Sequence, residues 1–168
     1  MAKISRDELI AGLNEDLQGE FGAVIMYRLF ASMVQGPYRQ ELRSFFASEI
    51  PEELAHAQIL ADKISALGGT PASTPEPVKV VKDVREMLQV ALDAEVATIE
   101  RYVKRRQQAA DAGEPGLATQ FDDMISDETN HRDELQQMLA RWPCPDSRLP
   151  RTAGLRTSAA PSPARRRR

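Results

Sequence analysis

The strongest constraint on this chain is a pair of Glu-x-x-His motifs, which contain its only two histidines. One motif runs from Glu53 to His56 and the other from Glu128 to His131. A spacing of three places the two side chains of each motif on the same face of a helix. The sequence therefore predicts two helices that each present a carboxylate and an imidazole together.

The two motifs belong to an internal repeat with a period of 75 residues. Shifting the chain by this length aligns four further pairs of identical residues: Glu20 with Glu95, Tyr27 with Tyr102, Phe46 with Phe121, and Leu60 with Leu135. The repeat indicates a duplicated helical hairpin. Each half then carries one Glu-x-x-His motif and one additional glutamate.

Composition and turn signals predict an all-α protein. Hydrophobic residues make up 42% of the chain, and β-branched runs are few, which favours a single helical core. Helices are expected over about residues 6–35, 38–67, 81–112 and 117–142, and Pro51 predicts a bend or a break in the second. The Gly- and Pro-rich segment 68–77 predicts a long crossover. The expected fold is an antiparallel four-helix bundle with this crossover between the second and third helices.

The polar residues of each expected helix fall near its midpoint, on an otherwise apolar stripe. Antiparallel helices of similar length bring their midpoints to the same level of a bundle. The residues expected to meet there are Glu20, Glu53, His56, Glu95, Glu128 and His131. Because buried carboxylates without a counter-charge are strongly destabilising, the sequence predicts that two divalent cations bind between them.

The donor types predict which metal binds and how. Glu53 and Glu128 are the expected bridging ligands, Glu20 and Glu95 the terminal ones, and each cation takes one histidine. Oxygen and nitrogen donors without a thiolate favour iron, with manganese as the alternative.

Three further acidic residues lie close to the expected ligands in sequence. Glu52 and Asp127, each directly before a bridging glutamate, are expected to accept the free N–H of a ligand histidine. Glu49 leaves two interpretations open, because it lies one turn before Glu53. It is either an additional iron ligand or a residue on the path by which iron enters, or it is an exposed glutamate without such a role.

The six expected ligands resemble the di-iron centre of ferritin-like carboxylate proteins, and their spacings are most similar to those of bacterioferritin, over about residues 5–142. The resemblance implies an up-down-down-up bundle and a ferroxidase for iron storage or detoxification, which oxidises Fe(II) at a two-iron site with O2 or H2O2. It also implies a catalytic role for Tyr27 as an electron donor, with simple packing as the alternative. Leu54 stands where bacterioferritins carry a haem-binding methionine, so haem is not expected.

Two other functions stay open at this point. One is a rubrerythrin-like or other di-iron peroxidase or oxygenase, although Cys144 alone cannot supply a rubredoxin site. The other is a Dps-like DNA-protecting protein. The resemblance further implies a homo-oligomer, either a dimer or a cage.

Charge divides the chain into an acidic body, residues 1–142, and a basic end, residues 143–168. The latter holds seven arginines against Asp146 alone, with several prolines, and is expected to be a disordered tail. It is a candidate for binding nucleic acid or for docking into an encapsulating shell, and a solvated extension is the alternative. Without a signal region or an apolar membrane-spanning segment, the protein is expected to be cytoplasmic, with no membrane partner.

Overall fold

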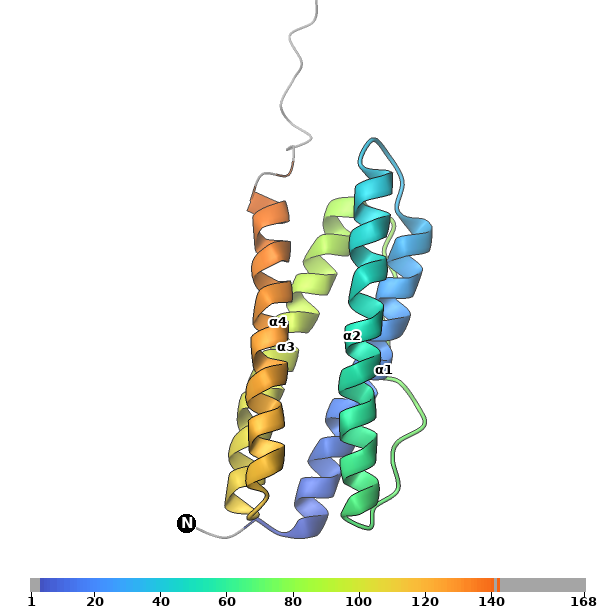
Figure 1. Cartoon of the computed structure of the whole chain (residues 1–168). Helices are drawn as coiled ribbons and strands as arrows, with labels where there is room; N and C mark the ends of the chain where they lie inside the picture. The colour runs from blue at the N-terminus through green and yellow to red at the C-terminus, as the bar shows by residue number, and fades with distance from the viewer. Residues whose placement is uncertain (1–3, 141, 143–168) are drawn as a thin grey trace, which may run out of the picture.

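The computed structural model describes residues 4–140 and 142, and their regular secondary structure is helical (Figure 1). Its elements in chain order are α1 (Arg6–Met33), α2 (Arg39–Ala66), α3 (Val84–Asp111) and α4 (Pro115–Ala140). Helix α1 packs on α2, α3 packs on α4, and α1 also contacts α3. In Figure 1, α1 and α4 run upward while α2 and α3 run downward. The predicted four-helix bundle is confirmed, whereas Cys144 and the expected tail lie outside the described residues.

Capping side chains fix where two of the helices begin. Ser5 and Glu8 form the predicted capping box at α1, with Glu8 N donating to Ser5 Oγ at 3.2 Å and Ser5 N donating to Glu8 Oε2 at 2.9 Å. Helix α3 begins at Val84, three residues later than expected from the sequence. Asp83 causes this difference, because its side chain accepts a hydrogen bond from Glu86 N at 2.9 Å and so caps the helix.

The sequence predicts a bend or a break at Pro51, and the break does not occur, because α2 runs uninterrupted from Arg39 to Ala66. A proline inside a helix removes one backbone hydrogen bond and costs about 3 kcal/mol. Apolar side chains of α2 are buried both before the proline, at Ile50, and after it, at Leu60. Packing of both parts against the bundle therefore keeps the helix continuous through the proline.

The apolar core is divided into two clusters by the polar residues at mid-bundle. One cluster includes Phe30, Phe46 and Leu135, and the other includes Leu13 and Phe121. Along every helix the central glutamates lie between residues of the first cluster and residues of the second. The two clusters hold the four helices together on either side of the polar centre. None of the helices in the described part of the chain is apolar enough over a sufficient length to cross a membrane.

The crossover between α2 and α3 runs along the bundle and is fastened to α1 (Figure 1). The side chain of Asn14 donates to Thr70 O at 3.2 Å and accepts from Ala72 N at 2.7 Å. Further along, Glu76 N donates to Gln18 O at 2.8 Å. These contacts hold the crossover against α1 of the first hairpin.

Candidate metal centre

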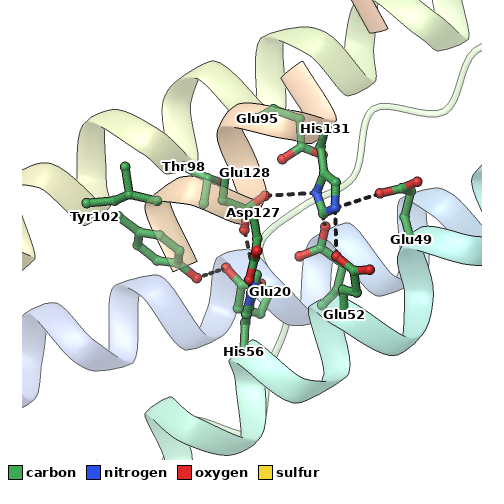
Figure 2. Close-up of polar contacts among 12 residues, drawn as sticks. Glu20, Glu49, Glu52, His56, Glu95, Thr98, Tyr102, Asp127, Glu128 and His131 are labelled. Atoms are coloured by element: carbon green, nitrogen blue, oxygen red, sulfur yellow. Dashed lines mark hydrogen bonds and ion pairs between the residues drawn. The ribbon is translucent and has the colours of Figure 1, made fainter. Parts of the chain in front are cut away.

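The centre of the bundle brings together the six residues that the sequence singled out, and Figure 2 labels all of them except Glu53. Helix α1 supplies Glu20, α2 supplies Glu53 and His56, α3 supplies Glu95, and α4 supplies Glu128 and His131. None of them is more than 8% exposed. Their possible ligand atoms form two groups of four residues, and within each group the atoms lie within 4.8 Å of one another. Glu53 and Glu128 belong to both groups, which is the placement expected of bridging ligands.

Each histidine turns one ring nitrogen into this cluster and the other toward its rim. Nδ1 of His56 lies 3.1 Å from Oε1 of Glu128, and Nδ1 of His131 lies 3.2 Å from Oε2 of the same residue. On the rim, Nε2 of His131 lies 3.0 Å from Oε2 of Glu52, and Nε2 of His56 lies 3.5 Å from Oδ2 of Asp127. When the outer nitrogen donates its N–H to a carboxylate, the ring is oriented so that the inner nitrogen can bind a metal. The contacts expected for Glu52 and Asp127 are present, and each is made with the histidine of the other hairpin.

Negative charge in the centre is not fully neutralised by neighbouring protein groups. Glu20 Oε2 and Glu53 Oε1 are buried and have no hydrogen-bond partner among the described residues. Burial, together with the charges of Glu128 and Glu20, raises the pKa of Glu53 well above its usual value. Burial and the charge of Glu128 do the same to the pKa of Glu95. The metal-free centre therefore retains protons where a cation would otherwise bind.

Both imidazoles are charged when no metal is bound. Burial alone would lower the pKa of His56, but Glu128 and Glu20 raise it to about 10. Burial also opposes the charge on His131, yet Glu128 and Glu49 raise its pKa to about 11. In return, hydrogen bonds from the two histidines outweigh burial and hold the pKa of Glu128 at about 2. Since a metal binds only a neutral imidazole, metal binding must release these protons.

Two buried tyrosines each contact the terminal glutamate of the other half of the repeat. Tyr27 Oη donates a hydrogen bond to Glu95 Oε1, and Tyr102 Oη donates to Glu20 Oε1. Burial and the charge of the contacted glutamate raise the pKa of both phenols, so both stay protonated at neutral pH. Each tyrosine therefore orients an expected ligand, and the role of Tyr27 as an electron donor stays a prediction.

The repeat is broken at Glu49, and the structure decides between the two interpretations of this residue. Glu49 is only 7% exposed and its Oε2 lies 2.9 Å from Nε2 of His131, so the interpretation as an exposed glutamate is wrong. The residue at the equivalent position of the second half is Met124, which is 1% exposed. His131 therefore meets both Glu49 and Glu52 at its outer nitrogen, whereas His56 meets Asp127 there. The sequence analysis missed this asymmetry, although the mismatch within the repeat was the signal for it.

The donor set fits a pair of divalent cations. Two such ions carry enough charge to balance the carboxylates of the four expected glutamate ligands once the histidines have lost their protons. Carboxylate oxygens and imidazole nitrogens without a thiolate suit iron or manganese. The unpartnered oxygens of Glu20 and Glu53 support the same fit, because buried polar atoms in proteins are normally satisfied by a partner.

Comparisons with known proteins bear on the family and the fold of the chain. A family model of the ferritin-like domain matches residues 10–144. A ferritin-like, diiron-carboxylate protein of Bacillus anthracis is 52% identical and superposes with a TM-score of 0.79, covering 81% of this chain and 99% of its own. The bacterioferritin of Streptomyces coelicolor is 29% identical over 133 residues, 79% of this chain and 80% of the relative.

A third similar protein is the dodecameric thioferritin of Bacteroides fragilis, described as bacterioferritin-related. It is 25% identical and superposes with a TM-score of 0.73, covering 82% of this chain and 88% of its own. The resemblance drawn from the six residues is confirmed by these comparisons, and the chain belongs to the ferritin-like family.

Proposed function

We propose that this protein is a ferroxidase that binds Fe(II) as its substrate and oxidises it to Fe(III) for iron storage or detoxification. The observation that carries the proposal is the pair of buried ligand groups joined through Glu53 and Glu128. Relatives named bacterioferritin, of which the chain covers about four fifths, support iron storage as the physiological role.

In the proposed site, each Fe(II) is held by one terminal glutamate, one histidine Nδ1 and the two shared glutamates. Glu20 and His56 serve one position, and Glu95 and His131 serve the other. Because both positions share Glu53 and Glu128, two irons bound there would be neighbours, which favours loss of one electron from each iron in the same event. Manganese uses the same donors and is the alternative ion.

The oxidation balances with either of two oxidants. Two Fe(II) give up one electron each, and O2 takes both electrons and two protons to become H2O2. With H2O2 as oxidant, the two electrons and two protons yield two waters. The two apolar clusters limit the access of water to the centre from both ends of the bundle.

Tyr27 is proposed to act beside this site, since its hydroxyl contacts the expected ligand Glu95. It orients that carboxylate, and this contact with an expected ligand is what supports a role for Tyr27 as an electron donor to the site. Haem is not proposed as a cofactor, because Leu54 has no thioether to bind it.

Stopped-flow absorbance of Fe(II) oxidation tests the proposal. Glu128→Ala and His131→Ala should abolish the rapid phase, since each removes a ligand, and Glu134→Ala on the exposed face of α4 should retain it. Circular dichroism should show an intact helical bundle in all three variants, because the two apolar clusters that hold the helices together are unchanged. Wild-type oxidation rates in both ligand variants would reject the site.

The proposal includes a homo-oligomer, as in the dodecameric Bacteroides relative. Size-exclusion chromatography with light scattering on iron-loaded protein separates the functional alternatives. A cage that retains hundreds of irons supports storage, whereas a dimer with two irons favours a di-iron peroxidase or oxygenase.

A further inference from the structure

A cavity outside the metal centre lies where α1, α3 and the crossover meet, and we call it the crossover cavity. Its lining comes from all three segments, with Gly22 from α1, Val78 from the crossover and Ala97 from α3. It has a volume of about 190 Å³. None of the six expected metal ligands occurs among its described lining residues. The crossover cavity is therefore separate from the centre to which the proposed function belongs.

Two glycines of α1 allow the other two segments to come close to this helix beside the cavity. A Cβ atom at Gly19 would lie 2.5 Å from Nη2 of Arg101, and one at Gly22 would lie 3.2 Å from the backbone oxygen of Glu76. Glycine is the residue that permits such an approach to a helix backbone. The guanidinium of Arg101 therefore reaches across from α3 to lie against α1.

The hydrogen-bonding capacity of Arg101 is only partly used by the protein. Its Nη2 donates to Thr98 Oγ1 at 2.9 Å, which is the only hydrogen bond from this guanidinium to the described residues. Its Nε is buried without a hydrogen-bond partner among them, and Oδ1 of Asp16 lies 3.8 Å away. Both oxygens of Asp16 accept hydrogen bonds from Arg105 instead. Because buried donors are normally satisfied, Arg101 has donors to offer to a ligand.

The lining of the crossover cavity combines this guanidinium with apolar side chains. The apolar lining residues are Ala23, Met26, Val78, Val90, Ala94 and Ala97. The charged ones are Arg101, Lys79 and Glu76, which leaves an excess of one positive charge. Glu76 is exposed, and Lys79 pairs with Glu86 at 3.2 Å, whereas the side chain of Arg101 is only 21% exposed. Arg101 is therefore the main binding group for an anion.

Shape and charge together select the class of ligand. A carboxylate matches a guanidinium, because its two oxygens can accept two parallel N–H bonds. An apolar cavity of roughly 150 Å³ binds benzene, so the crossover cavity, with about 190 Å³, has room for one ring and a carboxylate. An inorganic oxyanion would leave the apolar part of the lining without a partner.

From these observations we infer that the crossover cavity binds a small monocarboxylate with an apolar body, either aromatic or short-chain aliphatic. Arg101 binds the carboxylate, and the body of the ligand packs on the alanines and valines of α3 and the crossover. The inference does not depend on the proposed function, because the site shares no residue with the metal centre.

Isothermal titration of benzoate into the full-length protein tests this site. One benzoate should bind per chain. Arg101→Gln should weaken binding about tenfold or more by removing charge-assisted hydrogen bonds, and Arg101→Lys should retain part of the affinity. Ala97→Leu should weaken binding to a similar degree by occupying the apolar part of the cavity.

Two analogues of benzoate separate the two parts of the site. Benzyl alcohol has the ring without the charge, and acetate has the carboxylate without the ring. Each should bind at least about tenfold more weakly than benzoate. Acetate binding as tightly as benzoate would overturn the apolar part of the inference, and benzyl alcohol binding as tightly would overturn the role of Arg101.

Matched controls carry the same substitutions at positions of α3 that do not line the cavity, Arg106→Gln and Ala110→Leu. Both should bind benzoate with wild-type affinity. If circular dichroism shows that Arg101→Gln is unfolded, Ala97→Leu and the two analogues decide the outcome. No saturable binding to the wild-type protein, or equal affinity in the cavity variants and their controls, would overturn the site. Neither result bears on the metal centre, because no expected metal ligand is altered.

Discussion

At the scale of single residues, the most unusual feature outside the metal centre is the buried arginine of α3. Arg105 is 2% exposed, and its Nε donates to Asp16 Oδ2 at 2.7 Å. Gly12 makes room for it, because a Cβ atom at that position would lie 1.6 Å from the Arg105 guanidinium. The repeat aligns Arg105 with Phe30, so the two halves fill equivalent positions with different chemistry.

This ion pair predicts a strong effect of a small change. Asp16→Ala leaves the Arg105 charge buried without its main partner, so unfolding in urea should show a loss of about 3 kcal/mol. Glu15→Ala is the matched control, since Glu15 contacts the same guanidinium at 3.0 Å but its side chain is largely exposed. The control should lose less than about 1 kcal/mol. Equal losses in the two variants would show that the buried pair has no special role.

The outer contact of His131 gives a second prediction at this scale. Glu52→Gln keeps the shape of the side chain but weakens the acceptor for the His131 N–H, so Co(II) affinity should fall about tenfold. Because Glu49 still contacts the same nitrogen, the expected loss of affinity is at the lower end of the range seen when a hydrogen-bond partner of a metal ligand is replaced. Isothermal titration should show no change for Glu134→Gln. An unchanged affinity in Glu52→Gln would remove Glu52 from the metal centre.

At the scale of helices, the sequence was sufficient to predict the elements and their order. The repeat and the midpoint position of the glutamates predicted which residues meet, because both depend only on helical periodicity and length. The start of α3 at Val84 was missed, since the signal of Asp83 was overlooked. The burial of Glu49 was left open, because a position one turn before Glu53 is compatible with a ligand role or with exposure, and its alignment with the apolar Met124 was not used.

Pro51 gives the prediction that belongs to a single helix. The expected break does not occur because tertiary packing outweighs the lost hydrogen bond, so replacing the proline should recover part of that cost. Pro51→Ala should raise the free energy of unfolding by about 1–3 kcal/mol, as measured in urea. The exposed position of Pro51 means that little packing is lost. A destabilised variant would indicate that α2 requires the local geometry imposed by the proline.

At the scale of the whole molecule, the protein joins two apolar clusters around a charged centre that is unfavourable without a cation. Protons take the place of the metal in the metal-free protein, on His56 and His131 and on the carboxyls of Glu53 and Glu95. Global stability is therefore linked both to pH and to metal.

The sign of this linkage follows from the raised pKa values. In the folded protein the pKa of His56 rises from 6.5 to about 10 and that of His131 to about 11. The protonated histidines therefore contribute fully to stability below their pKa in the unfolded chain, and this contribution is lost as the pH rises toward their pKa in the folded protein. The raised pKa values of Glu53 and Glu95 act in the same direction. The melting temperature of metal-free protein should therefore fall between about pH 7 and about pH 10. The melting temperature of metal-loaded protein should fall much less over the same pH range. An equal decrease in the two forms would contradict the linkage.

The central claim is that the six converging side chains hold two metal ions, and anomalous X-ray diffraction at the iron edge tests it most directly. Crystals soaked anaerobically in ferrous salt should show two peaks between Glu53 and Glu128, one beside Nδ1 of His56 and one beside Nδ1 of His131. A centre without iron peaks in crystals that bind iron elsewhere would contradict the claim.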